Sequence, residues 1–391
     1  MNLENLPKID EVLSSLYSRL KLQRKVEYIP LNQAANRVLA EDMLSKNTLP
    51  VVRSSKLDGV AVNFSDFQEN YPERKIWEKD IDYCLADTGD DFNPKFDTVI
   101  PIENITFLKD GNIKLSPDFI LNKYSGVNKS GSHLKSQELL IKKDTLLNFF
   151  HLNLMASGGY NALPVYEKPI VTYIPTGNEL IYPSISPSRG ENIESNGIMV
   201  RNLIEQWGAR LITYPICKDI RANLNSILDE ALFFSDIVLI NGGSSKGSED
   251  FNTKIIEDKS SFFQHRVKVA PGFPIGIGII DNKPVINLPG PPIATFAAMH
   301  WCVKNLINYY LKVNNPLKNI AYGELATDLK TPEKIDLYLL LRIDILQNKL
   351  VVRPFSNKER HAEKMHLCNA ITRVPAGSNL RKGDSIKFEW I

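Results

Sequence analysis

The chain has 391 residues, 43% of them hydrophobic and 24% charged, with a formal net charge of +2 at pH 7. This length exceeds what one hydrophobic core organises and predicts roughly two to four domains. The near-balanced charge argues against a nucleic-acid-binding protein, and the absence of an apolar run of roughly 18 residues argues against a membrane span.

The cysteines and histidines indicate a reduced environment and give no metal-site pattern. Cys84, Cys217, Cys302 and Cys368 are far apart and form no C-x-x-C pair, so we expect each to be a free, buried thiol. The six histidines show no paired spacing, which argues against a His-ligated metal. Residues 1–5 lack the regions of a signal peptide, so we expect a cytoplasmic protein.

The first part of the chain predicts helices around an inserted β domain. Residues 8–24 have apolar side chains at helical spacing and end in basic residues, and residues 31–40 predict a short second helix. Residues 60–142 contain short alternating strands and many turn residues, which is typical of a small all-β insertion. Residues 144–167 predict a helix followed by a short strand.

From residue 169 to about 312, apolar strands alternate with helical segments, which is the pattern of a doubly wound α/β sheet. Helices are predicted at residues 198–207, 220–234, 253–258 and 294–311. Beyond residue 316 the chain returns to short strands, at residues 337–345, 350–353 and 385–390. A small C-terminal β-barrel or sandwich is therefore expected.

Three apolar strands run directly into glycine- or proline-rich turns. Residues 171–176, 237–241 and 285–288 are continuous Val/Ile/Leu-rich runs, which suit parallel strands buried on both faces. Ligands of open α/β sheets bind at the carboxyl ends of such strands. We therefore expect the three following turns to converge on one ligand-binding crevice.

The turn after the second strand has the composition of an anion-binding loop. Gly242 and Gly243 allow a close backbone approach, Ser244 and Ser245 add hydroxyl donors, and Lys246 adds positive charge. The alternative is a flexible connecting loop. The G-x-x-x-x-G-K-[ST] pattern of a Walker A loop is absent.

Acidic residues follow two of the three strands. Glu179 and Asp250, with Asp58 and Asp219, are candidates to hold a divalent cation, because hard cations prefer carboxylate oxygens. For Asp219 the alternative is an N-cap, and this role is favoured because the residue directly precedes a predicted helix. For Asp58, which precedes Gly59, the alternative is a simple turn.

Two further groups remain candidates on weaker local patterns. Pro289 and Pro292 would hold rigid backbone at the edge of the site, or make a plain strand-to-helix turn. Arg266 and Lys268 alternate on a predicted strand, where they would face an anionic substrate or solvent.

Seven segments, in order along the chain, resemble motifs of the molybdopterin molybdenumtransferase family, known as MoeA in bacteria and as the gephyrin E domain in animals. The matching segments are SKLDGVAV at 55–62 (S-x-M-D-G-Y-A-V), Thr88-Gly89 (T-G-A-P), TGNEL at 176–180 (T-G-D-E-L), SNG at 195–197 (D-S-N), 242–250 (S-G-G-V-S-x-G-x-x-D), PGFP at 271–274 (K-P-G-K-P) and LPGPP at 288–292 (L-P-G-N-P).

The resemblance implies a four-part subunit. Its parts would be a helical domain (1–43 and 143–167), an inserted β domain (44–142), an α/β molybdopterin-binding domain (168–314) and a C-terminal β-barrel (315–391). It further implies a homodimer whose active cleft lies between the α/β domain of one subunit and the inserted domain of the other.

The resemblance also implies a reaction and a set of site residues. Adenylylated molybdopterin and molybdate would be the substrates, Mg²⁺ would assist cleavage of the adenylate, and a molybdopterin adenylyltransferase would be a possible partner. The catalytic residues would be Asp58, Glu179 and Asp250, with Glu179 and Asp250 on the metal. The substrate-binding residues would be Thr88, Thr176, Gly177, Asn196, Asp219, Gly242, Gly243, Ser244, Ser245, Arg266, Pro289 and Pro292.

The chain departs from the family pattern where charge matters. The R-G-E-D motif aligns near residues 137–140 (QELL), and Ala270 and Phe273 stand where the family has two lysines. Loss of charged contacts to a phosphate is not a minor change. The chief alternative is therefore a non-enzymatic protein of the same fold that binds the cofactor intermediate or acts as a scaffold. Two further alternatives are an adenylyl-transferring molybdopterin-binding protein, like the single-domain relatives of the α/β unit, and a tungstate-handling enzyme, which would have the same sequence pattern.

Overall fold

The protein is described by a computed structural model, which covers residues 5–71, 77–109, 113–242, 251–313, 319–356 and 359–391. The chain divides into two compact units, Met1–Glu27 with Tyr166–Ile391 and Tyr28–Val165. Each unit is built around its own apolar clusters. No helix within these ranges has the length and apolar character needed to cross a membrane.

A six-stranded mixed sheet forms the centre of the first unit, in the order β15-β12-β16-β20-β19-β17. The four strands β15 (Arg210–Thr213), β12 (Ile170–Pro175), β16 (Ile237–Asn241) and β20 (Lys283–Leu288) are parallel. The strands β19 (Gly276–Ile280) and β17 (Phe262–His265) are antiparallel. The three predicted parallel strands are thus adjacent, and their carboxyl ends meet at one edge.

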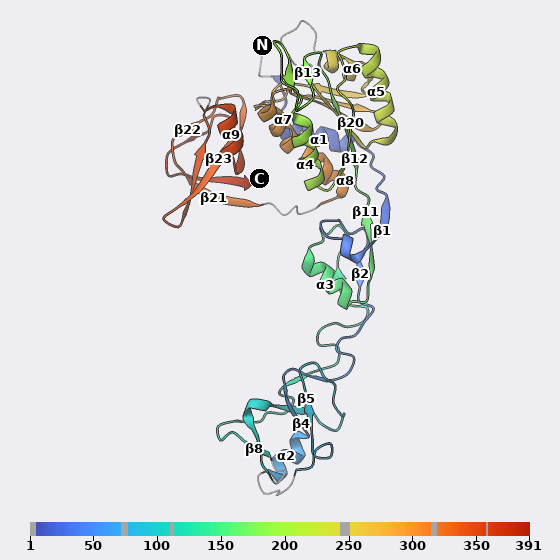
Figure 1. Ribbon diagram of the computed structural model, residues 1–391, viewed down its shortest axis with the longest axis vertical. Coiled ribbons are helices and arrows are strands. Elements are labelled where there is room, and N and C mark those ends of the chain that lie inside the picture. The colour runs from blue at the N-terminus through green and yellow to red at the C-terminus, as the bar shows by residue number, and fades with distance from the viewer. Residues whose placement is uncertain (1–4, 72–76, 110–112, 243–250, 314–318, 357–358) are drawn as a thin grey trace. The chain divides into compact units, whose positions relative to one another are not determined.

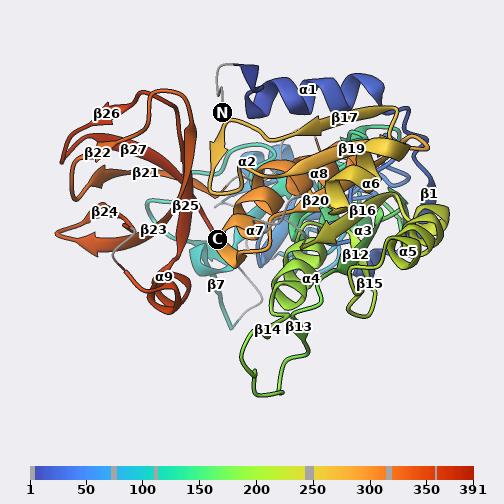
Figure 2. The same cartoon turned by 90° about the horizontal axis from the view of Figure 1, so that it is seen from above.

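Helices cover both faces of this sheet, as Figures 1 and 2 show. On one face, α5 (Arg221–Phe234) and α6 (Phe251–Lys259) pack against apolar side chains that include Val238, Ile240 and Val285. The other face is covered by α4 (Asn196–Gln206) and by α7 (Pro292–Ala298), which continues through a π-helical turn, η4 (Met299–Val303), into α8 (Lys304–Leu311). All four predicted helices are present.

The C-terminal strands close into a five-stranded barrel, because β23 pairs with both β24 and β25. Its core contains buried Leu341, Val352, Ile386 and Phe388. The barrel strands are β21 (Ile320–Leu325), β23 (Asp336–Leu346), β24 (Lys349–Pro354), β25 (Ala370–Val374) and β27 (Ser385–Trp390), and the minor elements are β22 (Leu329–Lys330), β26 (Asn379–Leu380) and α9 (His361–Leu367).

Ion pairs join the barrel to the rest of the first unit. Arg373 on β25 donates to both carboxylate oxygens of Asp10 in α1 (Ile9–Arg19), at 3.0 and 3.1 Å, and to Asp336 on β23. On β27, the Glu389 carboxylate pairs with Lys304 of α8 and lies 3.5 Å from His300 Nε2. Burial by itself raises the pKa of Glu389, but the hydrogen bonds and charges of His300 and Lys304 outweigh it and lower the pKa to about 2.

Replacing Glu389 with glutamine should therefore lower the free energy of unfolding at pH 7 by about 2 kcal/mol. Because the folded-state pKa is depressed, this contribution is complete above the ordinary carboxyl pKa of 4.5 and disappears as the pH falls toward 2. Tryptophan fluorescence during urea unfolding at several pH values would measure it, and Trp207 lies beside His300 as a reporter. The exposed pair Glu363–Arg360 provides the control Glu363→Gln, and an equal effect of both variants would contradict the prediction.

The second unit contains only short strands and helices. One apolar cluster includes Leu39, Met155 and Leu163, and a second includes Val60, Trp77 and Ile100. The elements of this unit and its border are β1 (Val26–Pro30), η2 (Leu31–Gln33), β2 (Met43–Leu44), β3 (Ser54–Ser55), β4 (Gly59–Val62), α2 (Phe64–Asn70), β5 (Tyr83–Ala86), β6 (Thr98–Pro101), η3 (Ile102–Asn104), β7 (Ile105–Phe107), β8 (Ile113–Leu115), β9 (Val127–Asn128), β10 (Leu139–Ile141), α3 (Phe149–Ser157) and β11 (Ala162–Tyr166).

Two local predictions were wrong. The helix expected at residues 31–40 is only the 3-10 turn η2, because Asn36 takes a left-handed φ of 60° and Leu39 bridges to Val165. Arg266 and Lys268 do not lie on a strand but between β17 and β18 (Val269–Ala270), with Arg266 at a φ of 70°.

The expected fold class is confirmed: a central α/β domain, an inserted β region, a helical segment and a C-terminal barrel are all present. The boundaries expected for the four domains stay predictions, since the division into two units does not test them.

Candidate active site

The three strand-to-turn junctions line one pocket of about 500 Å³ in the first unit. Thr176 and Glu179 line it from the turn after β12, and Asn241 and Gly242 line it from the end of β16 and the residue that follows. The turn after β20 lines it with Gly290, Pro291 and Pro292. The remaining lining residues are Leu180, Asn192, Ile193, Glu194, Ser195 and Asn196. The segment that enters α4 thus completes the wall.

A buried amide network joins these junctions on the α4 face of the sheet. Asn241 Nδ2 donates to the carbonyl of Pro289 at 2.8 Å, and Asn241 Oδ1 accepts from Asn196 Nδ2 at 2.8 Å. The Tyr173 hydroxyl lies 2.8 Å from Asn241 Oδ1 and 2.9 Å from Glu194 Oε1. Burial raises the pKa of Tyr173, and the charge and hydrogen bond of Glu194 raise it further, so the hydroxyl keeps its proton.

On the opposite face, Asn252 of α6 holds two strand ends together. Its Nδ2 donates to Thr176 Oγ1 at 2.8 Å and to the carbonyl of Gly242 at 3.0 Å. Thr176 N in turn donates to the Asn241 carbonyl at 2.8 Å. The floor of the pocket is therefore fixed by hydrogen bonds from both sides of the sheet.

Gly242 occupies a position that excludes a side chain. Its φ is 134°, and an added Cβ would lie 2.0 Å from the carbonyl oxygen of Thr176. Gly242→Ala should displace the end of β12 and destabilise the protein by about 3 kcal/mol. Gly290 lines the same pocket with nothing within 4 Å of an added Cβ, so Gly290→Ala is the matched control. Thermal unfolding would measure both, and equal melting temperatures would contradict the prediction.

The described wall of the pocket is acidic. Glu179 and Glu194 are the charged side chains among its lining residues, and none of these residues is basic. An anionic ligand would meet repulsion here unless a cation accompanied it. The wall therefore suits either a cation-bridged anion or a group that donates hydrogen bonds.

Asp219 is placed beside the same junction but is not an N-cap. The N-cap position of α5 belongs to Ile220, which has no side-chain cap, so the favoured prediction for Asp219 was wrong. Its Oδ2 instead accepts from Asn178 N at 3.3 Å, and Asp219 N donates to Asn178 Oδ1 at 3.2 Å. This reciprocal pair ties the turn after β12 to the segment before α5.

In the second unit, Asp58 and Thr88 contact each other directly. Asp58 Oδ1 accepts from both Thr88 N and Thr88 Oγ1, each at 2.7 Å. The side-chain hydrogen bond of Thr88, followed by its backbone hydrogen bond, lowers the pKa of Asp58. The carboxylate is exposed and ionised, and Gly59 on β4 leaves no room for a side chain beside it.

Of the other predicted site residues, some contact residues of the pocket wall, one takes no part in the described wall, and some are outside the described part of the chain. Pro289 acts through its carbonyl, as an acceptor for Asn241, and Gly177, with a φ of 152°, lies against the Glu179 carboxylate. Arg266 does not line this pocket within the described ranges. The remaining predicted residues, Gly243, Ser244, Ser245 and Asp250, lie outside the described residues.

A mostly apolar pocket of about 710 Å³ adjoins the first and shares Pro291 with it. The acidic and basic residues of its lining are Asp328, His361 and Lys364. Ala270 and Pro271 form part of one wall, and Leu337, Leu339 and other barrel residues form another. Ala270, which replaces a lysine of the family motif, therefore lines a mostly apolar space.

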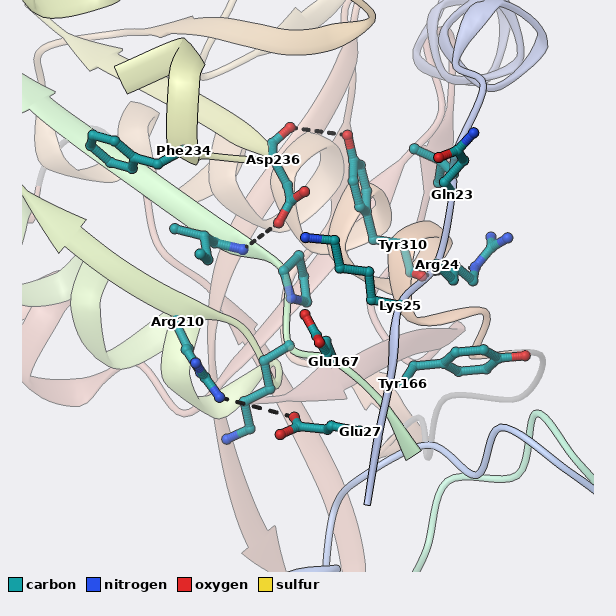
Figure 3. A pocket seen from close by; sticks show the side chains of 14 residues that line it. Gln23, Arg24, Lys25, Glu27, Tyr166, Glu167, Arg210, Phe234, Asp236 and Tyr310 are labelled. Atoms are coloured by element: carbon teal, nitrogen blue, oxygen red, sulfur yellow. Dashed lines mark hydrogen bonds and ion pairs between the residues drawn. The ribbon is translucent and has the colours of Figure 1, made fainter. Parts of the chain in front are cut away.

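A third pocket of about 240 Å³ lies at the opposite edge of the sheet, where β12, β15 and β16 begin (Figure 3). Charges of both signs line it, but several are engaged within the protein: Asp236 Oδ2 accepts from Ile170 N at 2.7 Å, and Arg210 lies 3.9 Å from Glu27. None of the predicted site residues lines it. The first pocket is therefore the candidate active site.

Within the described residues, no group of three or more His, Cys, Asp or Glu forms a metal cluster. Glu179 nevertheless supplies one carboxylate to a pocket wall that has no Lys, Arg or His among its described residues. Mg²⁺ typically binds one or two protein carboxylates together with the phosphates of its ligand. The donor set fits a magnesium ion that arrives with a phosphorylated ligand.

Sequence reasoning missed Tyr173, Asn241, Asn252 and Glu194. Asn241 had a usable signal, because it is the polar end of an otherwise apolar strand. Tyr173 had none, since an aromatic residue inside a buried strand normally indicates core packing.

Two family models match this chain. The "MoeA N-terminal region (domain I and II)" matches residues 7–159, and the "Probable molybdopterin binding domain" matches residues 172–309. The second match contains all three strand-to-turn junctions of the candidate site.

Similar proteins are found along nearly the whole chain. A molybdopterin molybdenumtransferase of Haemophilus influenzae is 26% identical over 311 residues, covering 76% of each chain. One of Staphylococcus aureus is 25% identical over 365 residues, covering 90% of this chain and 87% of the relative. A molybdopterin biosynthesis MoeA protein from Pyrococcus horikoshii matches with a TM-score of 0.82 at 22% identity, covering 99% of this chain and 100% of that one. At that identity the structural match establishes the fold.

Proposed function

This chain belongs to the MoeA family, and from that premise we propose that it acts in molybdenum cofactor biosynthesis as a molybdopterin molybdenumtransferase. The substrates are molybdopterin carrying an adenylate and molybdate. Water attacks the phosphoanhydride bond, so that AMP leaves and the other phosphate stays on molybdopterin. The two dithiolene thiols replace one oxygen of molybdate, which leaves as water, and molybdenum remains on the dithiolene sulfurs. The single observation that carries this proposal is the convergence of the three strand-to-turn junctions on one acidic pocket.

The proposed roles follow the chemistry of the side chains. Glu179 and Asp250 hold Mg²⁺, which neutralises the charge on the phosphates when it is bound. Thr176 and Gly242 shape the floor of the pocket through the bonds of Asn252. Asp58, kept ionised by Thr88, positions or deprotonates the attacking oxygen.

The proposal includes an assembly and a location. The protein is a cytoplasmic homodimer, and Asp58 and Thr88 reach the site of the partner subunit in that dimer. A molybdopterin adenylyltransferase supplies the adenylylated substrate. Size-exclusion chromatography with light scattering would test the dimer, and a monomer that retains full turnover would contradict it.

A second candidate is a non-catalytic molybdopterin-binding or scaffold protein. The observation that favours it is the mostly apolar space beside Ala270, at a position where the family motif has lysine. A site with fewer cations would hold the ligand without stabilising the charge that develops during phosphoanhydride cleavage.

One experiment separates the two candidates. The purified protein is incubated with adenylylated molybdopterin, molybdate and Mg²⁺, and AMP is followed by chromatography. Mg²⁺-dependent AMP release, with activation of a molybdoenzyme apoprotein, supports the transferase. Ligand binding without AMP release supports the scaffold and rejects the proposed reaction.

A further inference from the structure

The amide of Asn196 in the candidate pocket has a fixed orientation. Its Nδ2 donates to the carbonyl of Gly290 at 2.8 Å and to Asn241 Oδ1 at 2.8 Å. A backbone carbonyl only accepts hydrogen bonds, and Asn241 Oδ1 is an acceptor as well, because Asn241 Nδ2 is held by the Pro289 carbonyl. The reverse orientation would place oxygen against oxygen at both contacts, so Nδ2 must point inward.

This orientation leaves a buried acceptor without a donor. Asn196 is only 8% exposed and lines the pocket, yet its Oδ1 has no hydrogen-bond partner within the described part of the chain. A buried amide oxygen without a partner costs free energy comparable to a lost hydrogen bond. A ligand N–H group would remove that cost.

Glu194, two residues earlier, adds a second acceptor to the same wall. Its Oε1 accepts from Gly197 N at 2.8 Å and contacts the Tyr173 hydroxyl, which fixes the carboxylate. Its Oε2 makes no hydrogen bond among the described residues, and the missing side chain of Gly197 leaves room for it, since an added Cβ would lie 2.8 Å away. No basic residue of the described wall competes for either free oxygen.

We propose that Glu194 and Asn196 bind the N–H-rich edge of the pterin ring of the substrate, an inference that rests on the proposed function. A pterin presents an N–H and an amino group side by side. Glu194 Oε2, which makes no hydrogen bond among the described residues, accepts from the amino group in a charge-assisted hydrogen bond, and Asn196 Oδ1 accepts from the neighbouring ring N–H. The phosphate end of the substrate then extends toward Glu179 and its magnesium.

Two commercial probes test this pairing without turnover. Pterin has the N–H and amino pair, whereas lumazine has a carbonyl oxygen in place of the amino group. Fluorescence titration near neutral pH should show that the parent protein binds pterin about tenfold or more tightly than lumazine, because the lumazine oxygen would face the Glu194 carboxylate.

The variant Glu194→Gln should reverse that preference. Its amide keeps its single oxygen for Gly197 N and places its NH₂ group where Oε2 was, so that it donates to the carbonyl oxygen of lumazine. Glu205→Gln, on the exposed side of α4, should keep the parent preference. A purely structural role for Glu194 would weaken both ligands equally.

The failures are distinguishable. If Glu194→Gln leaves the preference unchanged, or if the parent protein binds neither probe, the ring assignment is wrong, whether or not AMP is released. If Glu194→Gln instead weakens binding of Mg²⁺ alone, the carboxylate is a metal ligand and the assignment is again wrong. If the preference reverses but no AMP forms with the full substrate, the ring is recognised and the proposed reaction is what fails.

Discussion

Replacing Glu179 with glutamine is expected to lower the rate of Mg²⁺-dependent AMP release by about 100-fold or more. Glu179 follows β12, is exposed, and supplies a carboxylate to a pocket wall without basic residues. Glutamine keeps the size and one acceptor oxygen but removes the charge that holds a divalent cation. The loss should therefore be partly recovered at high Mg²⁺ concentration, which a titration of turnover against Mg²⁺ would measure.

The control for this variant lies in the same segment of the chain. Glu191 is exposed and does not line the pocket, and its carboxylate accepts only from Ser188 N among the hydrogen bonds described. Glu191→Gln should retain parent turnover, and both variants should melt within about 2 °C of the parent protein. Parent-like turnover by Glu179→Gln would remove this residue from the metal site.

The parallel strands of the sheet could be predicted from the sequence because each strand is a local run of apolar residues. The strands β12, β16 and β20 are continuous apolar runs, which suit strands buried on both faces, and their alternation with helices indicates a parallel sheet. The structure shows that the three strands are adjacent. For the C-terminal part, strands separated by turn residues predicted a barrel or a sandwich, and the pairing of β23 with both β24 and β25 makes it a barrel.

Predictions failed where distant contacts decide the local conformation. Leu39 belongs to a helical pattern by spacing, but its bridge to Val165 draws it into an extended segment. Asp219 precedes a helix as an N-cap would, but Asn178 binds its carboxylate and the helix begins one residue later than that role requires. No local pattern contains Val165 or Asn178.

In the hydrogen-bond network of the site, too, a local motif identifies a residue, but contacts that are distant in sequence decide how its side chain lies. Asn196 was selected from a motif, but the reason for its importance lies in Asn241, Thr295 and Gly290, which are 45 to 99 residues away in sequence. The orientation of the Asn196 amide, which decides which of its atoms is left without a partner, depends on Asn241 and Gly290. A sequence identifies such a residue without indicating which of its atoms faces the ligand.

Asp58→Asn is the second variant for which a loss of about 100-fold in turnover is expected, because the proposed role of Asp58 requires an ionised carboxylate. Asparagine retains the acceptor oxygen that Thr88 contacts through N and Oγ1 at 2.7 Å, so the local fold should persist. Circular dichroism should match that of the parent protein. Undiminished AMP release would exclude Asp58 from the reaction.

Thr88→Val tests the same carboxylate by a change in pH dependence. The Thr88 hydroxyl favours the ionised form and lowers the pKa of Asp58, so its removal raises that pKa toward the ordinary value of 3.8. Activity that needs the carboxylate must then fall at a higher pH on the acid side of the pH–rate profile, while the rate near neutral pH changes little. Thr106→Val, at an exposed strand position of the same unit, should leave the profile in place. An unshifted acid limb in Thr88→Val, with Asp58→Asn inactive, would mean that Asp58 acts through a hydrogen bond and not through its charge.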